Sequence, residues 1–367
     1  MTTSRRHFLK LVAGSAAALA VPSIVRAHAT EMAWYDVREW GVEGKGWSNT
    51  NRYYDRLPSK AEGVVRTPVW DLSRHSAGMT VQFITDATEI HVRYALLSDR
   101  LALPIMPATG VSGLDLYASD AQGVQRWAGV VRPTEQSIET AIATNLRPGK
   151  RRYTIYLPLY NGVESLEIGT EEGATFEPIS PRTERPVLFY GTSIMHGASA
   201  SRPGMAIPAI LGRRLNRPTL NLGFSGNGRM EPEVAALLSE LDPCVYAIDC
   251  LPNMNAETVA ERAAPLVRQI RSEHPDTPIL LVEDRSFTNT RFSSTREEFH
   301  RTNRDALRHA FLQLQDEGVD HLFYLQGDQL LGHDGEAATD GSHPSDLGMV
   351  RYADAYEPAL RAMLRQY

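Results

Sequence analysis

The sequence predicts an α/β fold in two parts: an antiparallel β-sandwich, followed by a parallel sheet covered on both faces by helices. Two patterns carry this prediction. Between residues 32 and 181, short segments alternate apolar with polar residues, which is the two-residue period of half-buried strands. After residue 186, apolar runs alternate with segments of helical length, as they do in parallel sheets. A chain of 367 residues is also too long for one compact core, so two domains are expected.

The chain begins with the features of an export signal. Arg5 and Arg6 precede an apolar, alanine-rich run at residues 11–21, and residues 27–29 (Ala-His-Ala) form a small-residue cleavage site. This is the twin-arginine pattern, so we expect the twin-arginine export machinery to recognise residues 1–29 as a signal peptide. The mature chain would then be periplasmic or secreted. A membrane anchor is the alternative, but the run is shorter than the roughly 20 apolar residues that a span needs.

Net charge argues against two classes of partner. The whole chain has a formal charge of −6, and loss of residues 1–29 removes four basic residues and no acidic one, which leaves −10. An acidic surface without basic runs argues against nucleic acid and against anionic membranes. No later segment is apolar enough to cross a bilayer, so we expect no stable membrane insertion after cleavage.

The first part shows short strands without long helical segments. Strands are expected at residues 81–83, 90–94, 153–157 and 166–168, with turn signals between them. Several short strands of this kind suggest an antiparallel sandwich. Four tryptophans lie early in the chain, at Trp34, Trp40, Trp47 and Trp70. Packing in the core and on strands is the favoured interpretation for them, and a platform that stacks sugars is the alternative.

A proline-rich, charged stretch at residues 177–186 is expected to link the two parts. This places the sandwich in residues 30–180 and the second domain in residues 186–367. In the second domain, strands are expected at residues 187–190, 219–222, 245–248, 279–282 and 321–325. Helices are expected at residues 257–271, 295–314 and 345–364, and Pro265 predicts a kink or an early break in the first. In such a fold the active-site loops lie at the carboxyl ends of the strands.

The two cysteines, Cys244 and Cys250, lie in one apolar run that is typical of a central strand. Six steps of about 3.3 Å place them far beyond disulfide reach. We therefore expect two buried free thiols. Neither the cysteine spacing nor nearby histidines suggest zinc.

A serine follows the first strand of the second domain at a point where the backbone can turn sharply. Ser193 stands behind Gly191-Thr192, although Gly-Thr-Ser also describes ordinary helix caps. The far end of the chain strengthens the signal, because residues 340–343 read Asp-Gly-Ser-His in a loop rich in glycine and proline. A hydroxyl nucleophile needs a general base and a carboxylate that orients the base. His343 and Asp340 can supply both.

Two further loops can supply hydrogen-bond donors. Residues 222–228 contain three glycines, which allow the backbone to approach a ligand closely, and Asn253 follows the third strand of this domain. Acyl transfer needs donors aimed at the oxygen that becomes negative in the tetrahedral intermediate. The N–H of the nucleophile, a glycine N–H and an asparagine amide can provide three.

These residues resemble a known family. Gly191-Thr192-Ser193, Gly226, Asn253 and Asp340-x-x-His343 are similar, in order, to the four sequence blocks of the SGNH/GDSL hydrolases, over residues 186–367. Residues 113–117 (Gly-Leu-Asp-Leu-Tyr) resemble the GxDLY signature of the sandwich domain that precedes some bacterial members. The resemblance implies a three-layer α/β/α catalytic domain preceded by a jelly-roll-like β-sandwich.

The resemblance also implies roles for individual residues in an esterase or deacylase. Ser193 matches the nucleophile, His343 the base and Asp340 its orienting carboxylate. Ser193 N–H, Gly226 N–H and the Asn253 side chain match the oxyanion hole. The chain departs from the usual Gly-x-Asn-Asp of the third block, where it reads Leu251-Pro252-Asn253-Met254. The first block reads Gly-Thr-Ser rather than Gly-Asp-Ser, which weakens inference about substrate from the better-known lipases.

The expected function is hydrolysis of a small acyl ester, with acetyl on a carbohydrate as the favoured substrate, and no metal or organic cofactor is needed. His196 and Arg202 are candidate substrate-binding residues, although solvated loop positions explain both equally well. Glu283 and Asp284 end a strand on the same edge, where an ordinary salt bridge explains them as well. Two alternative functions stay open: a non-catalytic glycan-binding protein, and an esterase or thioesterase for lipid-type acyl substrates.

Overall fold

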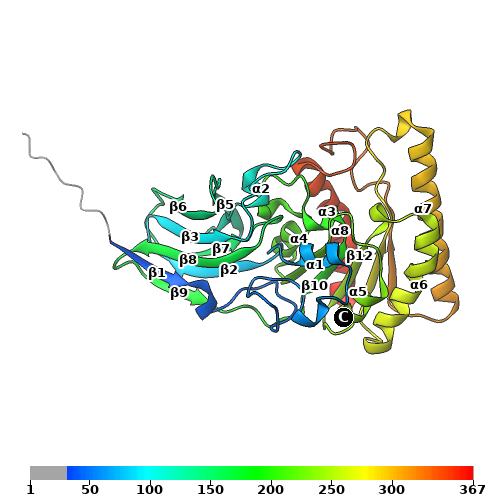
Figure 1. Cartoon of the computed structure of the whole chain (residues 1–367), viewed down its shortest axis with the longest axis horizontal. Helices are drawn as coiled ribbons and strands as arrows, with labels where there is room; N and C mark the ends of the chain where they lie inside the picture. The colour runs from blue at the N-terminus through cyan, green and yellow to red at the C-terminus, as the bar shows by residue number, and fades with distance from the viewer. Residues whose placement is uncertain (1–30, 367) are drawn as a thin grey trace, which may run out of the picture. The chain divides into compact units, whose positions relative to one another are not determined.

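The computed structural model describes residues 31–366, and from Met32 onward the chain forms one compact unit. The predicted signal peptide, residues 1–29, lies outside the described residues. Among the described helices, none combines the length and the apolar character that a membrane span requires. The order of elements is the predicted one, with strands first and alternating strands and helices after them (Figure 1).

Two antiparallel sheets make up the first part. One sheet has the strand order β1 (Met32–Asp36), β8 (Val163–Glu171), β3 (Ile90–Leu96), β6 (Ser137–Ala143). The other has the order β5 (Gln125–Val130), β4 (Asp115–Ser119), β7 (Arg151–Tyr156), β2 (Thr80–Thr85), β9 (Phe176–Ile179). Each predicted strand of this part coincides with one of these elements, except that the strand predicted at residues 153–157 runs one residue past the end of β7.

The two antiparallel sheets share one apolar core, as expected for a sandwich. In β3, Ile90, Val92 and Tyr94 are buried while the residues between them are more exposed, so the predicted two-residue period is present. These side chains belong to the same apolar cluster as Phe83 of β2 and Ile155 of β7, in the other sheet. The antiparallel sandwich prediction is therefore confirmed.

A five-stranded parallel sheet forms the second part. Its order is β11 (Thr219–Gly223), β10 (Val187–Gly191), β12 (Val245–Asp249), β13 (Ile279–Val282), β14 (Leu322–Leu325). All five predicted strands are present. The chain goes from β10 to β11 on one side and then returns to β12 on the other, so the strand order reverses at β10. Open α/β sheets bind ligands at such a reversal, outside the carboxyl ends of the strands.

Helices cover both faces of the parallel sheet. Alternate strand residues such as Tyr190 and Ile248 join an apolar cluster with α5 (Pro232–Leu238), α6 (Ala256–Glu273) and α7 (Ser294–Asp316). The residues between them, such as Phe189 and Ala247, join a second cluster with α4 (Ile207–Leu215) and α8 (Asp346–Gln366). Helices α6 and α7 lie side by side on one face (Figure 1). The three-layer α/β/α prediction is confirmed.

Two local expectations need correction. Helix α6 runs through Pro265 without a break. Pro265 lies on its exposed face, where water can solvate the backbone carbonyl that loses its N–H partner. The cysteines are free, as expected, but only Cys250 is buried, whereas Cys244 is partly exposed just before β12.

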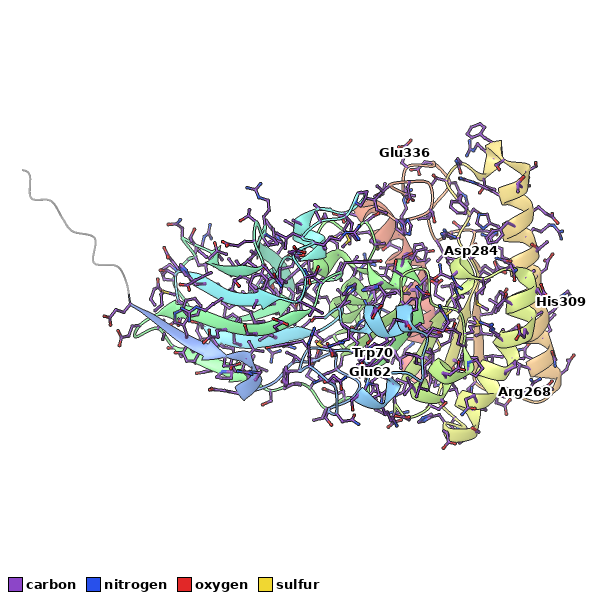
Figure 2. All side chains as sticks on the ribbon, viewed as in Figure 1. Glu62, Trp70, Arg268, Asp284, His309 and Glu336 are labelled. Carbon is purple, nitrogen blue, oxygen red and sulfur yellow. The ribbon has the colours of Figure 1, made fainter. Side chains whose placement is uncertain are left out.

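The segment between β1 and β2 leaves the sandwich and packs on the parallel sheet. Leu57, Val65 and Val69 are buried in the same apolar cluster as β10 and α6. Trp70 of α1 (Thr67–Ser73), labelled in Figure 2, is buried there too, while the other early tryptophans are partly exposed. The two parts therefore share a core. The boundary at residues 181–185, as a limit of independent folding, stays a prediction.

Candidate active site

Ser193 lies on a sharp turn at the carboxyl end of β10. It is the first residue of a one-turn helix, α3 (Ser193–His196), and the Thr192 side chain caps this helix by accepting a hydrogen bond from Ile194 N–H at 3.3 Å. A Cβ atom at Gly191 would approach the Asp249 carbonyl oxygen to 2.7 Å, so only glycine fits where β10 ends beside β12. The turn therefore places Ser193 just past the carboxyl end of β10.

The Ser193 hydroxyl meets His343, which lies 150 residues further along the chain. Ser193 Oγ is 2.9 Å from His343 Nε2, and His343 Nδ1 is 2.8 Å from Asp340 Oδ2. The other carboxylate oxygen of Asp340 accepts hydrogen bonds from the N–H groups of Ser342 at 3.0 Å and His343 at 2.8 Å. The structure thus brings the three predicted side chains together in the order hydroxyl, imidazole, carboxylate.

Electrostatics fix the protonation pattern of this chain of groups. Burial by itself would raise the pKa of Asp340, but the hydrogen bonds from His343 and Ser342 hold this pKa below its usual value. Because an ionised carboxylate only accepts hydrogen bonds, His343 Nδ1 carries the proton in this contact. His343 Nε2 is then free to accept the proton of the Ser193 hydroxyl.

The two loops that carry the predicted oxyanion donors Gly226 and Asn253 are joined to each other, and the first of them packs on the serine turn. Gly226 has φ +70° and faces open space, since no atom lies within 4 Å of a Cβ placed there. Two residues on, a Cβ at Gly228 would approach the Gly191 carbonyl oxygen to 2.1 Å, so this loop packs directly on the serine turn. Gly228 N–H donates to Asn253 Oδ1 at 3.3 Å. This bond orients the Asn253 amide and leaves its Nδ2 group as a donor.

The third block keeps its asparagine despite its unusual sequence. Residues Leu251–Asn253 form a 3₁₀ turn, with Pro252 in its first positions, where a missing N–H costs nothing. Met254, which stands where the family has aspartate, is buried in the core, and its carbonyl oxygen accepts a hydrogen bond from Asn303 at 2.8 Å. The unusual sequence of this block therefore changes the residues around Asn253 but keeps the asparagine itself.

The expected substrate contact of His196 is wrong. The residue is fully buried, and its ring stacks on Tyr160 with a centroid distance of 4.2 Å. Its Nε2 lies 3.5 Å from Nη2 of the buried Arg56. Burial first, and then the charge of Arg56, lower the pKa of His196, so the ring is neutral. It packs the serine turn against the first part of the chain.

Arg202, the other candidate substrate-binding residue, pairs with the sandwich, and a contact with substrate stays a prediction. Its guanidinium donates to Asp115 Oδ2 at 2.8 Å and to the Tyr117 hydroxyl at 2.6 Å. Asp115 and Tyr117 belong to the Gly-x-Asp-Leu-Tyr sequence on β4. Gly204 N–H donates to the same Asp115 oxygen at 2.8 Å. The signature of the sandwich thus ties β4 to the loop that follows the serine turn.

Sequence reasoning missed Tyr160, which comes from the first part of the chain. Its hydroxyl donates to the Ser193 carbonyl oxygen at 3.4 Å and also bonds the Ser225 side chain. It therefore braces both the serine turn and the loop of Gly226. Tyr160 stands beside Asn161-Gly162, which predicted only a turn, so the sequence held no signal for this role.

Glu283 and Asp284 follow β13 as buried members of ion-pair networks. Glu283 accepts hydrogen bonds from the Tyr324 hydroxyl at 2.7 Å and from Gly327 N–H at 2.9 Å. Asp284 pairs with Arg285 and with His300 Nδ1, the latter at 2.7 Å. Burial opposes its charge, but these two partners hold the pKa of Asp284 below its usual value. Within residues 31–366, no cluster of three or more histidine, cysteine or carboxylate side chains has the arrangement of a metal site.

Two family models match the chain, one on each part. The model of the GDSL-like lipase/acylhydrolase family matches residues 184–361. The model of the GxDLY domain, described as the N-terminus of SGNH-hydrolase-type esterases, matches residues 32–176. Comparison with curated proteins gives no match.

Solved structures resemble the chain over nearly its whole length. A GDSL-like lipase from Bacteroides ovatus ATCC 8483 is 32% identical, with a TM-score of 0.87, over 91% of this chain and 98% of its own. The salicylyl-acyltransferase SsfX3 from a tetracycline biosynthetic pathway is 18% identical, with a TM-score of 0.69, over 92% and 98%. The acetyl xylan esterase Est2A from Butyrivibrio proteoclasticus is 9% identical, with a TM-score of 0.55, over 92% and 99%. The last two show the shared fold alone.

Proposed function

Because the chain belongs to the GDSL-like lipase/acylhydrolase family and is an ester hydrolase, we propose that Ser193, His343 and Asp340 form its catalytic triad. The observation that carries this proposal is the pair of contacts through His343, 2.9 Å to Ser193 Oγ and 2.8 Å to Asp340 Oδ2. Distances of this kind allow the imidazole to act as a general base while the carboxylate fixes its tautomer.

In the proposed mechanism, His343 Nε2 takes the proton of the Ser193 hydroxyl as Oγ attacks the carbonyl carbon of the ester. The carbonyl oxygen becomes negative and accepts hydrogen bonds from Ser193 N–H, Gly226 N–H and Asn253 Nδ2. His343 then gives the proton to the departing alkoxide, which is released as the alcohol. The acyl group stays bound to Ser193 Oγ as an acyl-serine. Water, activated by the same imidazole, then hydrolyses the acyl-serine and releases the acid.

The proposed substrate is a small acyl ester, with acetyl on a carbohydrate as the first choice. The expected export of the chain would place it where extracellular polysaccharides occur, and we propose a periplasmic or secreted location on that basis. Structural neighbours described as carbohydrate esterases and as an acetyl xylan esterase share this two-part fold, which supports the same choice.

The first test uses the chain from residue 30 with p-nitrophenyl acetate. Replacing Ser193 with alanine should lower kcat by a factor of about 10³ or more, because the nucleophile is lost. Ser272→Ala, a change of the same kind at an exposed position on α6, should leave kcat unchanged. Equal turnover by S193A and the unmodified enzyme would remove Ser193 from the mechanism.

The second test addresses the substrate class. Activity should fall along a series of p-nitrophenyl acetate, butyrate and octanoate, and acetylated xylan should release acetate. A preference for octanoate would indicate lipid-type substrates. Failure of a fluorophosphonate to label Ser193, together with no turnover of any ester, would favour a non-catalytic glycan-binding protein.

A further inference from the structure

The loop after β13 supports the loop that carries Asp340 and His343. Thr288 N–H donates to the Gly341 carbonyl oxygen at 2.9 Å. The Arg285 guanidinium donates through Nε to the Ser342 carbonyl oxygen at 3.3 Å and through Nη2 to the Ser342 hydroxyl. Two loops that follow different strands are thus joined at residues 341 and 342, directly between the carboxylate and the imidazole.

Arg285 is held rigidly for this contact. Its side chain is only 2% exposed, and its Nη1 pairs with Asp284, whose side chain is fully buried. The other carboxylate oxygen of Asp284 contacts His300 Nδ1 at 2.7 Å (Asp284 is labelled in Figure 2). His300 Nε2 in turn accepts a hydrogen bond from Phe287 N–H at 3.1 Å. The Phe287 ring lies 4.6 Å from the Arg285 guanidinium, so the planar group has a partner on its face as well as on its edges.

The loop that Arg285 contacts is short and close to solvent. The side chains of Asp340 and His343 are 37% and 26% exposed. Within the loop, Thr339 N–H donates to the His343 carbonyl oxygen at 2.8 Å, and Gly341 has φ +86°. These contacts set the shape of the loop. Its position relative to Ser193 of α3 depends on what the loop packs against, and the buried Arg285 guanidinium holds it through Ser342.

We propose that Arg285 is a positioning residue for the hydrolytic reaction: by holding Ser342, it keeps His343 Nε2 within hydrogen-bond reach of Ser193 Oγ. This inference rests on the proposed catalytic triad. Misplacing a catalytic group by about 1 Å can cost about a hundredfold in rate. Arginine is needed because its planar fork reaches Asp284 and both Ser342 oxygens at once, which a lysine ammonium cannot do.

The main test is Arg285→Lys in the otherwise unmodified enzyme, assayed with p-nitrophenyl acetate. R285K keeps a positive charge beside Asp284 but lacks the planar guanidinium that bonds Asp284 and Ser342 together. We therefore expect kcat to fall about 10- to 100-fold while KM changes less than about twofold. The matched control is Arg304→Lys. Arg304 holds the same loop through the Asp284 carbonyl oxygen and Ser286, and its remaining side-chain hydrogen bond goes to Asp328 rather than to residues 340–343. R304K should keep kcat within about twofold.

A double-mutant cycle separates positioning from a purely structural role. Ser342→Ala removes only the hydroxyl that Arg285 contacts and should lower kcat about fivefold, whereas Ser342→Thr keeps a hydroxyl and should restore kcat. The double variant R285K/S342A should lose less than the product of the two single losses, because both changes break one contact. The Ser342→Ala and Ser342→Thr variants still decide the question if R285K folds poorly.

The inference is overturned if R285K or S342A keeps the kcat of the unmodified enzyme, or if their losses simply multiply. It is also overturned if R304K loses as much kcat as R285K, since loop stability alone would then explain the effect. An enzyme that keeps its activity after Ser193→Ala would contradict the triad itself, which is a different result from an active triad that does not need Arg285.

Discussion

Each side-chain oxygen and ring nitrogen of the proposed triad has a defined hydrogen-bond partner. Asp340 divides its two oxygens between the backbone of its own loop and the His343 ring, so the carboxylate sets both the loop shape and the ring orientation. One replacement can separate these two effects. Asparagine in place of Asp340 keeps an oxygen for the backbone N–H groups and presents an N–H donor to His343 Nδ1.

We therefore expect Asp340→Asn to fold normally and to lose kcat by about 10³- to 10⁴-fold. The new N–H donor favours the imidazole tautomer with its proton on Nε2, which cannot accept the Ser193 proton. Circular dichroism and the kcat for p-nitrophenyl acetate check this. A loss smaller than tenfold in a folded variant would mean that the carboxylate charge has little part in the reaction.

Asp249, at the end of β12, is a buried carboxyl with an incomplete set of partners. Its Oδ2 accepts a hydrogen bond from Tyr356 at 2.6 Å, while its Oδ1 has no partner among the described residues. Burial raises the pKa of Asp249 to about 7. The folded chain therefore holds a proton here between about pH 4 and pH 7 that the unfolded chain releases.

The sign of the pH effect follows from linkage. In this range the folded state binds more protons than the unfolded state. The contribution of Asp249 to the free energy of unfolding therefore falls as pH rises from about 4 to 7, by at most about 1.4 kcal/mol per pH unit. Above pH 7 its contribution is constant. Asp249→Asn should remove this contribution. Urea unfolding of both proteins at pH 5 and pH 8 measures it, and a stability difference between them that does not change with pH would contradict the assignment.

Among secondary-structure elements, β4 is joined to the loop after the serine turn by an ion pair whose carboxylate, Asp115, is fully buried. Asp115 has no exposed surface, and it accepts hydrogen bonds from Trp127 Nε1 as well as from Arg202 and Gly204. Gly204 lies in η3 (Pro203–Met205), the 3₁₀ turn that leads into α4. The carboxylate therefore connects a sandwich strand to the segment between α3 and α4.

Removing one partner of a buried pair leaves the other charge uncompensated. We expect Arg202→Met to lower the free energy of unfolding by about 3 kcal/mol. Arg214→Met on α4 is the control, because Arg214 pairs with the more exposed Asp354 and Glu357 and should cost less than about 1 kcal/mol. Equal losses in urea unfolding would show that the pair does not join the two parts.

At the scale of the whole molecule, the two parts share buried groups. Arg56, in the segment between β1 and β2, is buried and donates to the carbonyl oxygens of Asn221 and Gly223 on and at the end of β11, at 2.9 and 2.8 Å. Burial lowers the pKa of Arg56 to about 9. Leu57 and Trp70 lie in the same apolar cluster as Tyr190 of β10 and Leu222 of β11, so the segment that carries Arg56 packs on the parallel sheet beside its helices.

We expect residues 182–367, expressed alone, to be insoluble or to lack a cooperative unfolding transition. Each fully buried apolar side chain that is lost removes about 1.5–3 kcal/mol of burial free energy, and several come from residues 57–70. The mature chain prepared in the same way is the control, and thermal unfolding followed by circular dichroism is the measurement. A soluble fragment with a sharp transition would show instead that the boundary at residues 181–185 separates independent domains.

The sequence by itself determined the strands of the parallel sheet, the fold class and which side chains could carry the chemistry. Most strands of the parallel sheet follow from apolar runs, because a strand buried on both faces favours apolar side chains. Ser193, Asn253, Asp340 and His343 could be chosen because each follows a predicted strand or stands in a short motif. Such signals are local and can be found within a few residues.

Only the tertiary structure decided what surrounds these side chains. It buried His196 under Tyr160, paired Arg202 with Asp115 and placed Arg285 under Ser342. Each of these contacts joins residues that lie at least 36 positions apart, as between 160 and 196. A charged or aromatic side chain has many possible partners at such separations, and which one it meets depends on how the packed elements fill space. The spacing of residues along the chain therefore does not predict these contacts.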